Sequence, residues 1–274
     1  MKKVLSLIAA IAMVGMLASC DQNGDDNGKN NQNNKPVERT YADITIDGQF
    51  ADWAALESPA TALVPVGAHY PLCKTLKAAA GKDHIYIYFE YELFQYLEDV
   101  MGEDEGGNPI VVNAVGTYQL GAPFEIFINS DFDNFTGGST YLWEAAGYEW
   151  MFESEEGFLA DGAVVDFPDK NLYIFDGEDG KDAWEAGGHI SPYTAVEDNF
   201  ITCAGVIQDN VALVEIALSK SAIGVGDDVD AIELGVCIYD EGWAAHGCLP
   251  SGGSDDPEAP ATYQIAVPML QILL

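Results

Sequence analysis

The chain has 274 residues, of which 45 are Asp or Glu and 11 are Lys or Arg, so its formal net charge is −34. A chain this anionic repels phosphate backbones, which excludes nucleic acid as a partner, and it disfavours anionic polysaccharides and lipid surfaces unless calcium bridges them. Its length allows one large domain or two small ones, and since no second linker interrupts it, we expect one.

The first twenty residues have the three parts of an export signal. Two lysines precede an almost wholly apolar run at 4–17, and small residues then lead to a cysteine. The run is shorter than the roughly 20 residues that a transmembrane helix needs. The tetrad LASC at 17–20 resembles the lipobox of bacterial lipoproteins. The resemblance implies a signal peptide over residues 1–19 and acylation of Cys20; an ordinary cleavable signal is the alternative.

A polar segment follows the acylated cysteine. Residues 20–38 are mostly Asn, Asp, Gly, Gln and Lys and hold too little apolar surface to fold, so they predict a disordered tether. Asp25 and Asp26 resemble the acidic tags that send some lipoproteins to the cell surface. We therefore expect an outer-membrane lipoprotein, on the cell surface or else on the periplasmic face, whose folded domain spans residues 39–274.

The folded part consists of short β-rich runs between Gly, Asp, Asn and Pro clusters. This pattern predicts an all-β, antiparallel β-sandwich of jelly-roll or immunoglobulin-like type. The predicted strands are 43–47, 84–91, 124–129, 148–152, 200–207, 211–218, 231–239 and 261–267. Helix is scarce, because only residues 94–101 and 220–223 have the pattern of one or two helical turns.

Four cysteines remain after the one at the lipobox. An even number in an oxidising compartment permits two disulfides in three connectivities, and buried free thiols are the alternative. No C-x-x-C pair occurs, which leaves zinc-ribbon and thioredoxin-like chemistry unsupported. The four are Cys73, Cys203, Cys237 and Cys248.

A series of motifs resembles the family 9 carbohydrate-binding modules and the related DOMON-like sandwiches. Residues 44–53 place an Asp-Gly turn after a strand and a tryptophan five residues beyond the glycine, as this family does at its opening. Further segments similar to the family follow in order at 76–90, 125–131, 136–149, 214–219 and 235–250. A proline common at the end of the late strand is absent. The resemblance implies a sandwich that holds a sugar chain, commonly with bound calcium and without catalysis.

Sugar binding uses flat aromatic faces against the C–H surface of a pyranose. Trp184 and Trp243 lie in polar, Gly-rich loops with little core to join, so we expect them to bind ligand, with His189 and Tyr193 nearby. The other three tryptophans lie in or beside strands and are expected in the core. These are Trp53, Trp143 and Trp150.

One loop gathers the hard oxygen donors that calcium prefers. The candidate metal ligands are Asn129, Asp131, Asp133 and Asn134. The loop is not an EF-hand, because Phe135 and Thr136 replace the third ligand and the required glycine. A different calcium loop completed by a distant carboxylate, or a solvated acidic turn, remains open.

The motifs of common enzyme classes are absent. The sequence has no nucleophile elbow, zinc-protease helix, Walker loop or dinucleotide fingerprint. We therefore expect a protein that is not an enzyme and that binds neutral glycan by aromatic stacking, with calcium as the one candidate cofactor. The alternatives are a lipoprotein that docks onto another outer-membrane protein and a glycan-cleaving enzyme.

Overall fold

The computed structural model describes residues 40–104, 106–118, 122–144, 146–154, 169–194, 200–253 and 266–274. The predicted signal peptide, Cys20 and the tether lie outside these ranges, as does most of the predicted strand 261–267. Within them, no helix is long and apolar enough to cross a membrane.

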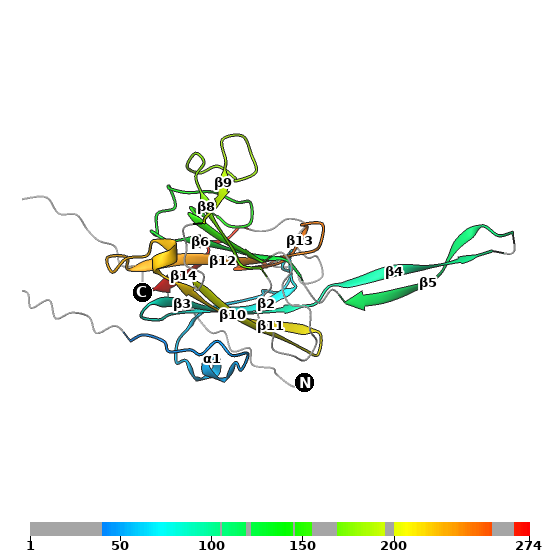
Figure 1. Cartoon of the computed structure of the whole chain (residues 1–274), viewed down its shortest axis with the longest axis horizontal. Helices are drawn as coiled ribbons and strands as arrows, with labels where there is room; N and C mark the ends of the chain where they lie inside the picture. The colour runs from blue at the N-terminus through cyan, green and yellow to red at the C-terminus, as the bar shows by residue number, and fades with distance from the viewer. Residues whose placement is uncertain are drawn as a thin grey trace, which may run out of the picture. The chain divides into compact units, whose positions relative to one another are not determined.

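The first sheet has five antiparallel strands in the order β1-β2-β3-β11-β10 (Figure 1). Their bounds are Ala60–Leu63 for β1, Cys73–Ala80 for β2, His84–Glu92 for β3, Val211–Ser219 for β11 and Ile201–Gln208 for β10. The long central pair β3–β11 is in register from Val211 opposite Glu92 to Ser219 opposite His84. Three strands predicted from the sequence, 84–91, 200–207 and 211–218, are thus confirmed to within a residue or two.

The second sheet has the order β13-β12-β6-β7-β8-β9, and β14 also pairs with β12. Its strands are β6 Phe124–Asn129, β7 Trp150–Ser154, β8 Asn171–Phe175, β9 Ile190–Pro192, β12 Ala231–Tyr239, β13 Ala245–Leu249 and β14 Leu270–Leu273. All the pairings are antiparallel, so the predicted all-β antiparallel sandwich is confirmed. The bounds predicted at 124–129 and 231–239 match β6 and β12, whereas β7 begins two residues later than predicted.

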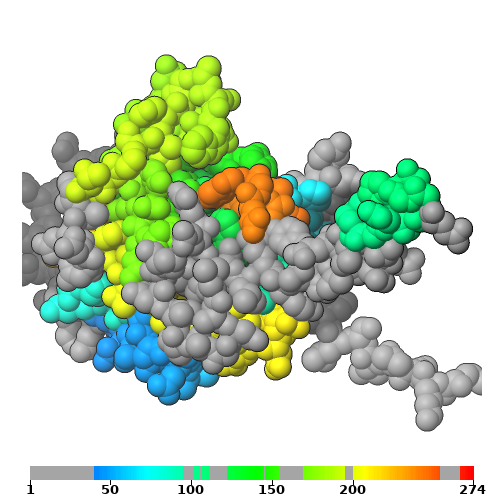
Figure 2. All heavy atoms as spheres, turned by 45° about the vertical axis from the view of Figure 1, so that its right-hand side comes forward, coloured from blue at the N-terminus to red at the C-terminus, as the bar shows by residue number. Residues whose placement is uncertain are grey.

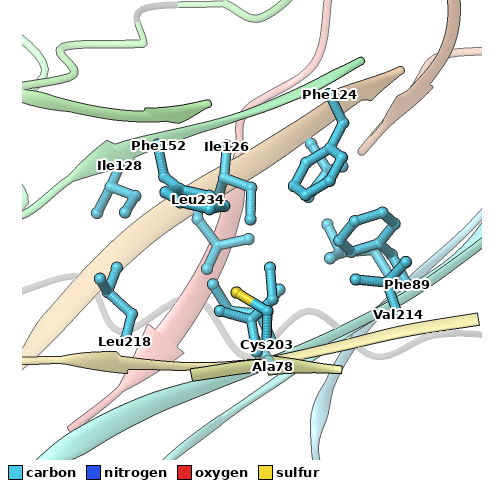
Figure 3. Packing of buried hydrophobic residues seen from close by; sticks show 14 of the residues in the cluster. Ala78, Phe89, Phe124, Ile126, Ile128, Phe152, Cys203, Val214, Leu218 and Leu234 are labelled. Carbon is cyan, nitrogen blue, oxygen red and sulfur yellow. The ribbon is translucent and has the colours of Figure 1, made fainter. Parts of the chain in front are cut away.

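Side chains that alternate along the strands fill the space between the two sheets. Phe124, Ile126 and Ile128 of β6 belong to one buried cluster with Phe89 and Val214 of the first sheet (Figure 3). Phe89 and Phe124 meet edge to face, with ring centroids 5.1 Å apart. Each fully buried side chain of this size stabilises the fold by roughly 1.5–3 kcal/mol, so this interior holds the sheets together.

The outer faces of both sheets are covered as well. On the first sheet, helix α1 (Ala51–Ala55) places Trp53 against Tyr88 of β3, with ring centroids 5.5 Å apart. On the second, long loops bury a separate cluster that includes Phe127, Trp143 and Tyr148. Every residue of β6 and β12 is therefore buried, although only alternate side chains reach the space between the sheets.

A two-stranded hairpin projects from the sandwich (Figure 1). Strands β4 (Gln95–Glu103) and β5 (Pro109–Tyr118) pair with each other and with no other described strand. The helical turns predicted at 94–101 are therefore wrong. The apolar spacing there fits a helix locally, but cross-strand pairing along all of β5 decides the conformation, and a local pattern cannot show that partner.

Two further predictions are corrected or refined. Residues 43–47 are not a strand, because they form no ladder with a described strand; the Ala42 amide just before them donates to the Ala80 carbonyl at 2.9 Å, and the Asp47 amide donates to the Glu215 side chain of β11 at 2.8 Å. Its apolar Ile44 packs instead in the cluster around Trp53. The predicted turn at 220–223 is confirmed as a short 3-10 helix over Ser221–Ile223.

The four cysteines are buried free thiols. Cys237 of β12 stands opposite Cys248 of β13, and burial raises the pKa of Cys248, as do its contacts with Cys237. The sequence left two alternatives open, disulfides or buried free thiols, and the structure has free thiols.

Candidate functional site

A pocket of about 400 Å³ lies on the outer face of the second sheet, under the loops that cover it. Its residues come from β6, β7, β12 and three connecting loops. They are Glu125, Phe127, Thr140, Tyr141, Leu142, Tyr148, Glu153, Asp182, Trp184, Tyr239 and Trp243. The pocket thus combines aromatic side chains with carboxylates. Figure 2 shows two of the contributing loops, the yellow-green segment near residue 184 and the orange turn near residue 243, on one side of the molecule.

The loop between β8 and β9 presents Trp184 at the end of a tight turn. The Asp182 carboxylate accepts the Trp184 amide at 2.9 Å, and the Asp182 carbonyl accepts the Glu185 amide at 3.1 Å. Asp is favoured at such turns because its side chain bonds the backbone two residues on. The loop requires glycine at position 188, because a Cβ there would lie 1.7 Å from the Asp182 carbonyl oxygen. The local sequence therefore fixes where this tryptophan stands.

The turn between β12 and β13 presents Trp243 in a different way. The Asp240 carboxylate accepts the amides of Gly242 and Ala244, at 2.8 and 2.9 Å, and contacts His246 Nε2 at 3.0 Å. Burial works to raise the pKa of Asp240, but these hydrogen bonds outweigh it and lower that pKa. Trp243 itself has φ of 61°, in the left-handed region that a bulky side chain rarely adopts. The turn holds the ring in this position at a conformational cost.

Three of the pocket's aromatic side chains are exposed, unlike the tryptophans of the core. Trp184 is 74% exposed, Tyr141 64% and Trp243 45%, whereas Trp143 and Trp150 are 2% and 8% exposed. The Trp243 ring packs against Tyr239, with centroids 5.5 Å apart. An aromatic ring left open to solvent at the mouth of a pocket forgoes burial that would stabilise the fold, and this is typical of ligand contacts.

The inner wall of the pocket carries buried acids. Glu125 of β6 is 5% exposed, and its Oε2 accepts the Tyr239 hydroxyl at 2.5 Å. Glu153 stands opposite it on β7 and accepts the Tyr173 hydroxyl at 3.1 Å. Burial raises the pKa of Glu125 to about 7, the Tyr239 hydroxyl opposes this rise, and the charges of Glu153 and Asp182 add to it. Glu125 therefore titrates near neutral pH.

The sequence predicted four ligand-binding residues, and the structure brings two of them together. Trp184 and Trp243 line the same pocket, as a two-walled site requires. His189 and Tyr193 are not among its lining residues. His189 contacts the Asp176 carboxylate and lowers its pKa, together with Ser191. Tyr193 packs edge to face on Trp150, with centroids 4.9 Å apart.

The residues predicted to bind calcium form a tight loop after β6. Asn129 is buried, and its Nδ2 donates to Asn134 Oδ1 at 2.8 Å. The exposed Asp131 and Asp133 accept the amides two residues further on, at 2.9 and 3.0 Å. In the part of the chain that the structure describes, no group of three His, Cys, Asp or Glu side chains is arranged to hold a metal.

A carboxylate from a later segment reaches the same loop. Glu149 accepts the Ser130 amide at 2.7 Å, and its Oε1 lies 3.5 Å from the Thr136 hydroxyl, which also contacts Asp131 at 3.2 Å. Burial raises the pKa of Glu149 to about 7; the Ser130 hydrogen bonds oppose this rise and the Asp131 charge adds to it. Oxygen donors of this kind fit Ca²⁺ chemically, and Glu149 is a distant carboxylate of the kind that the sequence left unidentified.

A larger hollow of about 670 Å³ lies beside α1, β1 and β14. Its walls are mostly small or aliphatic residues such as Ala55, Ala78 and Leu273, with Tyr41 as the one aromatic residue and Glu57 as the one acid in its lining. Its lining holds no pair of flat rings. Size alone does not make it a ligand site, and we favour the smaller aromatic pocket.

Several pocket residues escape sequence reasoning. Glu125 is one of 45 acids, and in a strand that reads Phe-Glu-Ile-Phe-Ile-Asn nothing marks it as part of a site. Tyr141 lies in the same long connection as the core residue Trp143, and only its exposure separates their roles. The alternation of β6 is the one usable signal, because it turns Glu125 away from the interior on which Phe124 and Ile126 pack.

Comparison with known proteins gives one structural likeness. No protein-family model and no curated protein match the sequence. Among solved structures, the chain is similar to a family 9 carbohydrate-binding module from Caldicellulosiruptor kristjanssonii in complex with cellotriose. The two are 10% identical, the match covers 85% of this chain and 90% of that chain, and the TM-score is 0.37. This is the family that the sequence motifs resemble; at this TM-score the likeness carries no argument about the ligand.

Proposed function

We propose that this protein binds carbohydrate, without catalysis, in the pocket between Trp184 and Trp243. The observation that carries the proposal is that these two exposed rings, from separate loops, line one pocket together with Tyr141. Flat rings stack on the C–H face of a pyranose, and the polar groups below them bond its hydroxyls. Glu125, Glu153, Asp182 and Thr140 supply those groups.

The test is binding of a panel of oligosaccharides to the purified chain and to the double variant Trp184→Ala/Trp243→Ala. We expect the parent to bind a defined set and the double variant to lose that binding, because both stacking faces are gone. Phe135→Ala is the matched control, since this ring is 89% exposed but lies outside the pocket. Unchanged affinity in the double variant contradicts the site.

An enzyme would use the same pocket differently. Glu125 and Glu153 are neighbours across β6 and β7, and paired carboxylates serve glycoside hydrolysis in other proteins. Incubating the bound oligosaccharides with the protein and measuring new reducing ends separates the two functions. Binding without new ends agrees with the proposal, and turnover that is lost in Glu125→Gln overturns it.

Docking onto an envelope protein is the second candidate, and the β4–β5 hairpin favours it. An isolated two-stranded hairpin is marginally stable in water, and its edges present unpaired backbone groups. A pull-down from solubilised envelopes tests this function with the full chain and with a variant whose residues 96–117 are replaced by a short turn. One stoichiometric partner that binds only the full chain, together with no oligosaccharide binding, would favour docking.

Calcium at the loop after β6 and the lipid anchor at Cys20 stay predictions. For calcium, we expect the unfolding temperature to rise in CaCl₂ and to fall back in chelator, with the rise absent in Asp131→Asn. Glu185→Gln is the control, because this acid pairs with Lys181 and not with the residues predicted to bind calcium. An equal rise in both variants means nonspecific binding to an anionic surface.

For the lipid anchor, the test is membrane fractionation of Cys20→Ala against the parent.

A further inference from the structure

The pocket has more negative charge than a neutral sugar requires. Three of its lining residues are acids, Glu125, Glu153 and Asp182, and its lining includes no Lys, Arg or His among the described residues. Ionised carboxylates only accept hydrogen bonds, so they satisfy the hydroxyl protons of a sugar but offer nothing to its oxygens. Three carboxylates around one ligand therefore favour a ligand that carries hydrogen-bond donors and positive charge.

Glu125 is placed to act on such a ligand. Its side chain is 5% exposed and lines the pocket, and Oε2 is held by Tyr239 at 2.5 Å. The other oxygen, Oε1, accepts no hydrogen bond from the residues that the structure describes. A buried carboxylate with one bonded and one available oxygen needs a further donor, and in a low-dielectric pocket a charged donor interacts most strongly.

The aromatic rings of the pocket also favour a positively charged ligand. An indole face carries negative quadrupole density and attracts a cation within about 6 Å of the ring centroid, and Trp is the strongest of the aromatic side chains in this respect. Trp184 and Trp243 therefore provide both a stacking surface for a pyranose and an environment that stabilises positive charge beside it. The ring chemistry and the acids thus select for the same ligand.

We propose that the pocket takes an amino sugar, a glycan whose protonated amine meets Glu125 while its ring stacks on Trp184 and Trp243. The inference rests on the proposed carbohydrate binding and replaces the neutral glycan expected from the sequence with a cationic one. The chain's net charge of −34 supports it, because a strongly anionic protein attracts cationic ligands over long range.

Three trisaccharides with one β-1,4-linked backbone test the inference. Cellotriose carries a hydroxyl at carbon 2, the N-acetylglucosamine trimer a neutral amide, and the glucosamine trimer an ammonium group. Titration calorimetry on the purified full chain at pH 7, where the amine is largely protonated and Glu125, with a pKa of about 7, is partly ionised, measures the affinity for each. We expect the glucosamine trimer to bind about tenfold more tightly than the other two, the gain typical of a hydrogen bond to a charged group.

Two variants assign the preference to the pocket. In Glu125→Gln the amide oxygen still accepts the Tyr239 hydroxyl but the negative charge is gone, so the preference should fall toward equal affinities. Asp182→Asn is the second variant, because it retains the turn's acceptor for the Trp184 amide and reduces the preference even if Glu125→Gln does not fold. Glu92→Gln is the matched control, because this acid pairs with Lys74 and lies outside the pocket lining, and it should retain the full preference.

The outcomes separate the inference from the function on which it rests. Equal binding of the glucosamine trimer and cellotriose overturns the inference and leaves carbohydrate binding intact, whereas no binding of any trimer overturns the proposed function. A preference unchanged in both pocket variants, or reduced equally in Glu92→Gln, shows only attraction to an anionic surface and overturns the assignment. Cadaverine, an amine without a sugar ring, completes the set. If it binds as tightly as the glucosamine trimer, the site recognises amines and not amino sugars.

Discussion

The two outer faces of the sandwich both place tryptophan and a buried glutamate together, but with opposite results. On the first sheet, Trp53 is 2% exposed and its Nε1 donates to Glu215 Oε2 at 3.2 Å. The amides of Asp47 and Gly48 donate to Glu215 Oε1 at 2.8 and 2.5 Å. Both carboxylate oxygens are thus satisfied from within the protein, and α1 closes the face.

On the second sheet, the rings stay open and the carboxylate keeps an available oxygen. Trp184 and Trp243 are exposed, and Glu125 accepts a single hydroxyl, that of Tyr239. The same pair of residue types therefore serves structure on one face and presents a site on the other. What separates them is whether the fold itself satisfies the acid and covers the ring.

The largest expected effect breaks the closed face. Trp53→Ala removes a fully buried ring and leaves Glu215 without one donor, so we expect a loss of about 3–5 kcal/mol in the free energy of unfolding. Denaturant titration measures this loss. Trp184→Ala, at an exposed ring, should change stability by less than about 0.5 kcal/mol. Comparable losses in the two variants would remove the distinction between the faces.

The second prediction concerns pH and the acids of the open face. The pKa of Glu125 is raised from 4.5 to about 7, so the folded state holds a proton that the unfolded state releases. Its contribution is fully present below pH 4.5 and is lost as pH rises through 7, by up to about 3 kcal/mol. Denaturant unfolding at a series of pH values should show stability falling across this window, and falling less in Glu125→Gln.

Glu149 offers the matched measurement, because its pKa is also raised to about 7 but it lies in the loop after β6. Glu149→Gln should flatten the same window by a smaller amount, since the side chain is only partly buried and solvent screens its charge. If the slope of stability against pH is the same in the parent and in Glu125→Gln, the pKa of Glu125 is not raised in the folded protein and its burial in the pocket wall is wrong.

The smallest expected effect is a difference in stability between two substitutions at Trp243 that abolish the same ring. Trp243 has φ of 61°, a conformation that glycine adopts freely and alanine does not. Trp243→Gly should therefore be about 1 kcal/mol more stable than Trp243→Ala, while both variants lose the ring and bind oligosaccharide equally weakly. Thermal unfolding and calorimetry together test this. A less stable glycine variant would mean that the turn changes conformation once the ring is gone.

The sequence predicts the strands of the interior well and their surroundings poorly. Residues 124–129 and 231–239 are apolar, β-branched runs between turn residues, and local preference there agrees with the fold. At 94–101 local preference fails, because the hairpin forms through pairing with residues 109–118. At 43–47 the alternation is present but the backbone has no ladder partner, so Ile44 is buried outside any strand. Pairing between distant segments is what a local window omits.

The sequence by itself determined the class of fold and the two tryptophans that the pocket presents. Period-two apolar runs can bury their side chains only in sheets, and a tryptophan in a polar, Gly-rich loop has no local core to enter. Only the tertiary structure decided that Trp184 and Trp243 share one pocket with Glu125, and that His189 and Tyr193 lie outside its lining. Residues 125, 184 and 243 meet because the second sheet brings β6 and β12 side by side beneath loops that the chain order keeps far apart.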